Sequence, residues 1–263
     1  MICAGIDAGS RAIKVVLIDA AGLDVIASGI TDQGVRQDAL ATELFDRVLA
    51  SRGLSRGDVA RTVATGYARN IVSLADTVIT EITCHACGVH HLVPEARTVI
   101  EIGGQDSKVL HLDTGGGVRD FAMNDRCAAG TGRFLELASA RLGVELSQVE
   151  AMTARSRKPA AISSMCAVFA ETEIIGLLAT GARHEDILAG VQASIASRIA
   201  GMVGRRLTPP AVFTGGVARV PSMAGALEKA LGLPVAVAPT PQMTGALGAA
   251  ILAARQAAGG GSR

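Results

Sequence analysis

Two cysteines stand at places in the sequence where a thiol can do chemistry. Cys127 lies in NDRCAAGTG, and Cys166 follows 39 residues later in ISSMCAVFAETEIIGLLATG. A stretch with helical periodicity follows each of them, and the amino-terminal end of a helix stabilises a thiolate or a cluster of net negative charge. We therefore expect both thiols to be functional, whereas Cys3, inside an apolar strand pattern, is expected to be a small buried side chain.

The helices that follow the two cysteines each have a predicted buried side. In RFLELASARLG, at 133–143, the apolar spacing marks Phe134, Leu137, Ala138 and Leu142. In the second helix it marks Val168, Phe169, Thr172 and Ile175, with Ser163 or Ser164 as the cap. The glycine-rich approach to the first helix also favours an anion close to its backbone N–H groups.

Two thiolates do not complete an iron–sulfur cluster, which typically takes four cysteines. A homodimer whose two-fold axis lies between these helices would supply four. A cluster within one chain, from Cys84, Cys87, Cys127 and Cys166, is the alternative. The motif CHAC also has the spacing of a redox pair or half a zinc site, but without a second such motif we interpret it as helix packing.

A repeat at an offset of 94 residues relates two strand–turn–strand stretches. Six pairs match: Ile6 with Ile100, Asp7 with Glu101, Gly9 with Gly103, Lys14 with Lys108, Val15 with Val109, and Asp19 with Asp113. A repeat of this length indicates a duplicated supersecondary unit. We expect two facing hairpins in a two-lobed protein, with a ligand in the cleft between the lobes.

The residues in and before the two turns indicate a phosphate ligand. Gly9, Gly103 and Gly104 let the backbone approach phosphate oxygens without a Cβ in the way. Asp7 and Glu101 then stand where a hydrated Mg²⁺ needs oxygen ligands. One such hairpin alone is compatible with an ordinary turn carrying an exposed acid, but the pair favours nucleotide binding.

Composition excludes several classes of function. The chain has 263 residues, of which 49% are apolar and 2% aromatic, so Val, Ile, Leu and Ala must build the core, as suits α/β layers. A net charge of +1 gives no electrostatic case for nucleic acid, and no apolar run reaches the about 18 residues of a membrane span. Five cysteines without an export signal argue against disulfides and predict a cytoplasmic protein. The end of the chain, 259–263, is predicted to be disordered.

The two hairpins resemble the phosphate-1 and phosphate-2 motifs of the sugar kinase, chaperone ATPase and actin superfamily. ITEITCHACG (79–88) resembles its first connecting helix, VFTGGVARVP (212–221) its adenosine motif and TGALGAAILAA (244–254) its second connecting helix. The resemblance implies an α/β, bilobal actin-like ATPase (ribonuclease H-like) fold with duplicated β-hairpin phosphate motifs. Lobe I would take 1–94 and lobe II 95–243, and the second connecting helix at 244–258 would return to lobe I.

This resemblance also implies an ATP or ADP site with Mg²⁺. The candidate nucleotide-binding residues are Asp7, Gly9, Ser10, Lys14, Gly103, Gly104, Gln105, Asp106, Gly215, Gly216 and Val217, and Asp7 would hold the Mg²⁺ through water. Gln105, Glu81 and Glu101 are the catalytic candidates, with Gln105 or Glu81 positioning the attacking water. Lys14 and Lys108 are expected to cap the hairpins or face solvent more readily than to touch phosphate.

Within the superfamily, IEIGGQDSK, NDRCAAGTGRFLE and the Cys166 segment look like the activator ATPases of 2-hydroxyacyl-CoA dehydratases and the ATPase subunits of benzoyl-CoA reductases. This likeness implies one [4Fe–4S] cluster per dimer, held by Cys127 and Cys166 of both subunits. It also implies a homodimer or a heterodimer with a paralogue, a ferredoxin or flavodoxin as electron donor, and a dehydratase or aryl-CoA reductase as acceptor. Cys87 departs from the pattern, because a basic or small residue is expected there.

Two other functions are compatible with the motifs. One is a small-molecule kinase of the same superfamily, such as an amino-sugar kinase, although we find no convincing acceptor-site insertion. The other is a non-enzymatic nucleotide switch that closes on ATP and binds a partner. The leading prediction is an ATP-driven electron-transfer activator.

Overall fold

The structure is a computed structural model, and it describes residues 1–163, 166–204 and 207–259. The chain forms two compact units. Unit 1 consists of Met1–Glu95, Leu112–Val118 and the chain from Met243 onward, and unit 2 of Ala96–His111 and Arg119–Gln242. None of the helices in these described ranges is long and apolar enough to cross a membrane.

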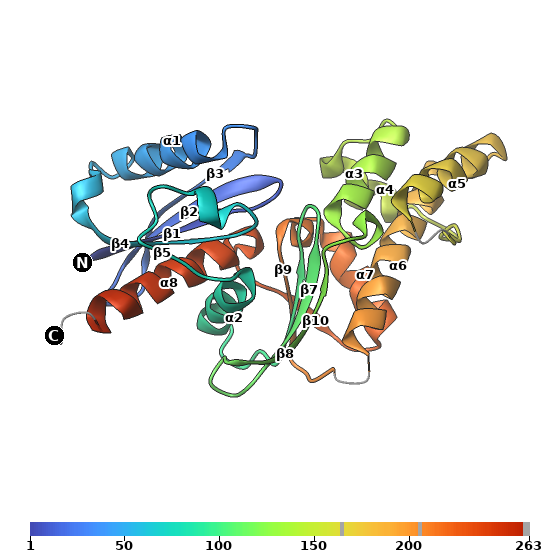
Figure 1. Cartoon of the computed structure of the whole chain (residues 1–263). Coiled ribbons are helices and arrows are strands. Elements are labelled where there is room, and N and C mark those ends of the chain that lie inside the picture. Colours follow the sequence, from blue (N-terminus) through green and yellow to red (C-terminus); the bar gives the residue numbers. More distant parts are fainter. Residues whose placement is uncertain (164–165, 205–206, 260–263) are drawn as a thin grey trace. The chain divides into compact units, whose positions relative to one another are not determined.

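Unit 1 is built on a five-stranded sheet in the order β3-β2-β1-β4-β5. Its strands are β1 (Ile2–Ala8), β2 (Ala12–Asp19), β3 (Val25–Asp32), β4 (Val59–Thr65) and β5 (Thr77–Val78). The chain also forms α1 (Gln37–Ala50), α2 (Glu81–Leu92), α8 (Thr244–Gly259) and the short 3-10 helices η1 (Arg56–Asp58) and η2 (Arg69–Ile71). Figure 1 shows α1 and α8 on opposite sides of this sheet.

Both faces of this sheet are covered because successive side chains of a strand point to opposite sides. Ile6, Val15 and Leu17 pack against α1, whereas Cys3 and Val16 pack against α8. The β1 and β2 segments, ICAGIDA and AIKVVLID, are therefore apolar almost throughout, as strands buried on both faces must be.

Unit 2 has a second five-stranded sheet, in the order β10-β9-β6-β7-β8. Its strands are β6 (Thr98–Ile102), β7 (Ser107–Leu112), β8 (Val118–Asn124), β9 (Ala211–Thr214) and β10 (Val235–Val237). The helices are α3 (Gly132–Arg141), α4 (Val149–Thr153), α5 (Ala167–Ala179), α6 (His184–Val203) and α7 (Pro221–Leu231). The 3-10 helices are η3 (Ala128–Gly130), η4 (Leu146–Gln148), η5 (Gly216–Arg219) and η6 (Pro241–Met243).

The two sheets repeat one topology. In each, the first strand pairs antiparallel with the second and parallel with the fourth, and the spatial order is third-second-first-fourth-fifth. The registers agree as well, because Asp7 lies opposite Lys14 and Glu101 opposite Lys108. The duplication predicted from the offset of 94 is confirmed over both sheets.

The crossover between the third and fourth strands differs greatly between the units. In unit 1 it runs over 33–58, which is 26 residues, and contains α1. In unit 2 it runs over 125–210, which is 86 residues, and contains the four helices α3 to α6. Cys127 and Cys166 both lie in this long crossover.

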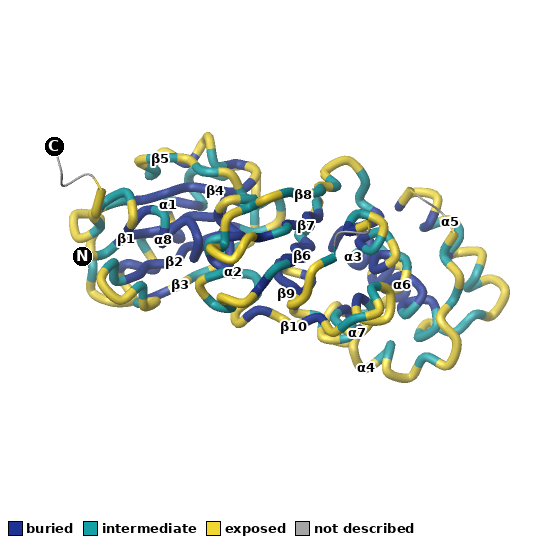
Figure 2. Tube along the Cα trace, turned by 90° about the horizontal axis from the view of Figure 1, so that it is seen from below, coloured by how far each residue is buried: buried dark blue, intermediate teal, exposed yellow. Residues whose placement is uncertain are grey.

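The predicted buried side of a helix is confirmed for α3 but not for α5. Phe134, Ala138 and Leu142 are buried as predicted, with Leu137 half-buried. On α5, however, the predicted buried side is wrong: Val168 is 67% exposed, Phe169 70% and Ile175 51%, and Thr172 is exposed as well. Exposed stretches of the trace are visible along α5 in Figure 2.

The buried side of α5 consists of small or branched residues a few positions away. Ala167, Ala170 and Ile174 enter the core of unit 2 instead. Ser163 does not cap α5, because its N–H and hydroxyl donate to the Glu173 carboxylate and the residue at the N-cap is Cys166. Ser164 lies outside the described residues, as does the predicted tail except for Gly259 in the last turn of α8.

Helices α2 and α8 approach each other at glycines. A Cβ on Gly248 would lie 1.8 Å from the carbonyl oxygen of Cys84, and a Cβ on Gly88 would lie 2.1 Å from that of Thr244. A side chain at either position would displace backbone. The two helices therefore pack backbone against backbone, and this contact fixes α2 in unit 1.

Gly248→Ala is expected to destabilise the protein by about 3 kcal/mol, because the new methyl group must displace the backbone of α2. Urea unfolding followed by circular dichroism measures this loss. Gly225→Ala is the matched control, since Gly225 lies inside α7 and its Cβ would meet nothing within 4 Å. That change should stabilise the protein by up to about 1 kcal/mol through helix propensity. Equal effects of the two substitutions would contradict the packing described here.

Candidate functional site

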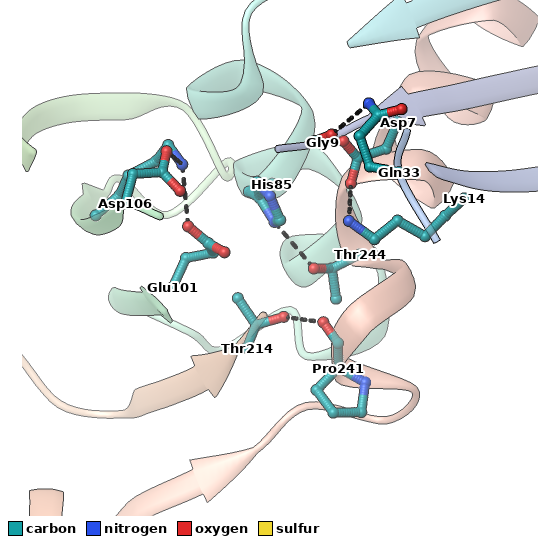
Figure 3. Close-up of polar contacts among 11 residues, drawn as sticks. Asp7, Gly9, Lys14, Gln33, His85, Glu101, Asp106, Thr214, Pro241 and Thr244 are labelled. Carbon is teal, nitrogen blue, oxygen red and sulfur yellow. Dashed lines mark hydrogen bonds and ion pairs between the residues drawn. The ribbon is translucent and has the colours of Figure 1, made fainter. Parts of the chain in front are cut away.

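In unit 1, Asp7 and Lys14 face each other across the β1–β2 hairpin (Figure 3). Lys14 Nζ donates to Asp7 Oδ2 at 3.0 Å, and the turn is closed by the Gly9 N–H, which donates to the Ala12 carbonyl at 3.1 Å. A Cβ on Gly9 would lie 3.0 Å from Lys14 Nζ. The ammonium group therefore lies at the predicted phosphate-binding turn and is paired with the acid, a pairing that was not predicted from the sequence.

The Asp7 carboxylate is buried among segments that are distant in sequence. A Cβ on Gly66 would lie 2.6 Å from Asp7 Oδ1, and a Cβ on Gly245 would lie 3.2 Å from Asp7 Oδ2 and 3.1 Å from His85 Nε2. The His85 ring is oriented by Thr244, whose Oγ1 lies 3.0 Å from its Nδ1. A side chain at Gly66 or Gly245 would crowd this buried carboxylate.

The equivalent hairpin of unit 2 is more deeply buried. Lys108 Nζ donates to Glu101 Oε2 at 3.0 Å and to Asp106 Oδ2 at 2.6 Å, and the lysine side chain is 1% exposed. The Gly103 N–H closes the turn on the Asp106 carbonyl at 3.0 Å. The expectation that Lys108 faces solvent is wrong, because two carboxylates offset the cost of burying its ammonium group.

The end of strand β9 packs against the Glu101 carboxylate. Gly215 has φ 92°, and a Cβ there would lie 2.4 Å from the Ile102 carbonyl oxygen and 2.7 Å from Glu101 Oε1. Thr214 Oγ1 donates to the Pro241 carbonyl at 2.6 Å (Figure 3). Only glycine combines this backbone conformation with this close approach.

The start of α3 is fixed to the turn of the same hairpin. The Gly132 N–H donates to the Gly103 carbonyl at 2.9 Å, and the Arg133 N–H to the Gly104 carbonyl at 2.8 Å. These first-turn N–H groups are the ones that lack partners inside a helix. The prediction of an anion at this helix start is therefore wrong, because the carbonyl groups of Gly103 and Gly104 already accept from the first two N–H groups of α3.

The other end of α3 reaches the helix that follows Cys166. Arg141, the last residue of α3, forms an ion pair with Glu171 of α5. Helix α3 thus links the phosphate-2 turn to α5 through contacts at its two ends.

The predicted nucleotide residues divide between the two units. Unit 1 brings together Asp7, Gly9, Ser10 and Lys14 around its turn, and unit 2 brings together Glu101, Gly103, Gly104, Asp106 and Gly215. Gln105 is exposed in the second turn, and Glu81 is the first residue of α2, behind its cap Thr80. In η5, Gly216 is exposed and Val217 is buried.

The cysteines of the CHAC motif lie in the packed interior of unit 1. No disulfide joins any of the five cysteines, all of which lie among the described residues. Burial raises the pKa of the Cys84 thiol to about 12, and burial also raises the pKa of Cys87. Cys84 belongs to the apolar cluster that α8 forms with the sheet, and Cys87 packs against it, which agrees with the interpretation of the motif as helix packing.

Cys127 and Cys166 reach the surface of unit 2. Cys166 is exposed at the N-cap of α5, beside the helix start that the sequence predicted near it, and Cys127 is half-exposed at the N-cap of the short helix η3 rather than at the start of α3. Asn124 clamps Cys127: its Oδ1 accepts from the Cys127 N–H at 3.1 Å, and its Nδ2 donates to the Cys127 carbonyl at 2.8 Å. The clamp fixes the backbone that carries the thiol.

A family model described as the BadF/BadG/BcrA/BcrD ATPase family matches residues 4–253. The chain belongs to this family. The activator of lactoyl-CoA dehydratase from Anaerotignum propionicum is 44% identical over 254 residues, which are 96% of this chain and 97% of that one. A component polypeptide of benzoyl-CoA reductase from Thauera aromatica is 33% identical over 223 residues, which are 82% of this chain and 78% of that polypeptide.

A solved structure agrees with these sequence relatives. The activator of the 2-hydroxyisocaproyl-CoA dehydratase from Clostridium difficile, solved with bound ADPNP, superposes with a TM-score of 0.94 at 40% identity, covering 99% of this chain and 97% of that one. Together the matches confirm the predicted resemblance, the actin-like α/β fold and an ATP-hydrolysing activity. They favour this ATPase family over the amino-sugar kinase.

Several residues of the two hairpin sites were missed from the sequence. Gln33 donates to the Gly9 carbonyl at 2.7 Å, and His85, like Asp7, lies next to Gly245, but no sequence signal connects either Gln33 or His85 to the turn. The pairing of each lysine with an acid had a signal, because the repeat and the hairpin register place the two opposite each other. Asn124 stands three residues before Cys127, at a spacing typical of side-chain to backbone bonds.

Lys108→Met is expected to destabilise the protein by about 3–5 kcal/mol, because it leaves buried carboxylates without their cation. Lys229→Met, at an exposed position on α7, is the matched control and should change stability by less than about 0.5 kcal/mol. Urea midpoints of the two variants and the parent measure the difference. A Lys108 variant as stable as the parent would show that the pair contributes nothing to folding.

Proposed function

We propose that this protein is an ATP-hydrolysing activator that delivers low-potential electrons to an enzyme of the 2-hydroxyacyl-CoA dehydratase or benzoyl-CoA reductase type. The observation that carries the proposal is the position of Cys127 and Cys166. Both thiols reach the surface of unit 2, in the crossover whose helix α3 is bonded to the phosphate-2 turn. Similarity to named activators over nearly the whole chain supports the same function.

ATP and ADP would bind at the turns of the two hairpins. Gly9, Ser10, Gly103 and Gly104 would offer backbone to the phosphates, with Lys14, Gln105 and Asp106 beside them, and η5 with Gly215, Gly216 and Val217 would meet the adenosine. Asp7 offers the oxygen donor that Mg²⁺ prefers, and it would hold the ion through water. Mg²⁺, when bound, supplies charge stabilisation for the transferred phosphoryl group.

The attacking water would be positioned by carboxamide and carboxylate groups. Gln105 is exposed in its turn, where its amide can accept from water and donate to a phosphate oxygen. Glu81, at the start of α2, is the second candidate for this role. Glu101 is held by Lys108, which keeps its carboxylate in place beside Gly215.

The residues present fit a [4Fe–4S] cluster shared between two copies of the chain. In the part of the chain that the structure describes, no three His, Cys, Asp or Glu side chains are arranged to hold a metal ion. Two surface thiols per chain would supply the four cysteines of such a cluster when two copies come together. The cluster, when bound, supplies one-electron chemistry at low potential, and Cys127 and Cys166 would hold it.

The exposed side of α5 supports a homodimer. Val168, Phe169 and Ile175, which follow Cys166 on this helix, are apolar and exposed. A second copy covering this surface would remove these side chains from water and bring a second pair of thiols to the first. A heterodimer with a paralogue would meet the same requirement.

The electron would come from a reduced ferredoxin or flavodoxin, and ATP hydrolysis would drive its delivery to the acceptor enzyme. We place this reaction in the cytoplasm, where thiols remain reduced. The acyl-CoA substrate belongs to the acceptor enzyme and not to this chain.

Asp7→Asn should slow Mg²⁺-dependent ATP hydrolysis by about tenfold or more, because the amide lacks the charge that holds the hydrated ion. Asp24→Asn, at an exposed turn position, is the control and should hydrolyse ATP at the parental rate. A phosphate-release assay over a range of Mg²⁺ concentrations measures both. Parental turnover in the Asp7 variant would exclude Asp7 from the metal site.

Cys127→Ala and Cys166→Ala should each lower the iron content of anaerobically purified protein to near zero, because each removes two of the four ligands from a dimer. Dimerisation should weaken, whereas ATP binding should survive. Cys87→Ala is the control and should keep its iron. Iron analysis and size-exclusion chromatography measure these outcomes. Full iron in either of the first two variants would contradict the shared cluster, and iron loss in the control would revive the single-chain cluster.

A further inference from the structure

A short motif occurs twice in the chain, once in each unit. Thr-Gly-Tyr-Ala-Arg occupies 65–69, and Thr-Gly-Gly-Val-Ala-Arg occupies 214–219. The first copy begins at the last residue of β4, and the second at the last residue of β9. Each of these strands lies parallel to the first strand of the acid–lysine hairpin in its own unit.

The two copies also share their backbone geometry. Gly66 has φ 93° and Gly215 has φ 92°. A Cβ on Gly66 would lie 2.6 Å from both the Ala8 carbonyl oxygen and Asp7 Oδ1. In the same way, a Cβ on Gly215 would approach the Ile102 carbonyl oxygen and the Glu101 carboxylate. The copy at 65–69, beside the first hairpin, is therefore the structural counterpart of the copy at 214–219, which is the motif expected to bind adenosine.

The segment at 66–69 lies at the edge of the sheet where α/β proteins bind ligands. The segment from Gly66 to Arg69 follows the carboxyl end of a strand parallel to β1, at the same sheet edge as the Asp7 carboxylate, and ligands of α/β proteins bind at the carboxyl ends of such strands. The Ala68 N–H donates to the Ala8 carbonyl at 2.9 Å, which fixes the segment to the hairpin.

Arg69 is the charged residue of this segment. Its side chain is half-buried, and its Nη1 donates to the Gly66 carbonyl at 3.1 Å, so the guanidinium lies next to the residue that contacts Asp7. Within the described chain no carboxylate pairs with it. A half-buried guanidinium whose charge no acid balances is suited to bind an anion, and its planar donors match phosphate oxygens.

We propose that Arg69 binds the terminal phosphate of ATP. The inference rests on the proposed nucleotide site and adds to it a residue that distinguishes the triphosphate from the diphosphate. Since charge on the transferred phosphoryl group must be stabilised during hydrolysis, the same contact would assist turnover. Gly66 is required because a side chain there would displace both Asp7 and the loop that carries Arg69.

Arg69→Met and Arg69→Lys test the proposal, with Arg52→Met at an exposed position after α1 as the matched control. Isothermal titration calorimetry with Mg²⁺ measures binding of ADP and of the non-hydrolysable analogue AMPPNP. Arg69→Met should weaken AMPPNP binding by about tenfold or more while ADP affinity is unchanged. Arg69→Lys should recover part of the loss, and the control should bind both nucleotides as the parent does.

The outcomes separate this inference from the proposed function. If the parent binds neither nucleotide, the proposed function fails and the inference fails with it. If the parent binds both and Arg69→Met binds AMPPNP as tightly, the inference alone is wrong. An equal loss of AMPPNP and ADP affinity would also overturn it, because Arg69 would then only support the fold of its loop.

Discussion

The pairing of a lysine with the acid directly opposite it is the interaction on which both phosphate hairpins depend. In unit 2, Lys108 is almost fully buried between Glu101 and Asp106, and a buried ammonium group costs several kcal/mol to desolvate unless carboxylates compensate it. The pair fixes where the acid points and where the turn begins. It also explains the glycine at the end of the neighbouring strand, since Gly215 packs against the paired carboxylate.

Helix α3 extends this constraint toward the cysteines. Its first two N–H groups are bonded to the phosphate-2 turn, and its last residue pairs with α5. A shift of the turn by a bound phosphate must therefore move the start of α3 or break two backbone hydrogen bonds. The structure thus offers a short route from the hairpin to the segments that carry Cys127 and Cys166, within one unit.

The repeat in the sequence predicted the hairpins because register and turn length follow from local spacing. It did not predict that Lys108 is buried, since burial depends on Asp106 and on the strands packed around it. The exposed face of α5 was assigned to the interior because periodicity identifies apolar residues without identifying what covers them. The bonds at the start of α3 were missed because their acceptors come from a turn far away in sequence.

The long crossover of unit 2 bears on how such a protein can arise. The described residues of 125–210 contribute no strand to either sheet, whereas both proposed cluster ligands come from this range. The short crossover of unit 1 shows that the same strand order closes with only 26 residues in that place. On the proposed function, the redox chemistry would reside in this crossover and outside the two duplicated sheets. A related protein could then gain or lose this crossover and keep the residues at the strand ends that are proposed to bind the nucleotide.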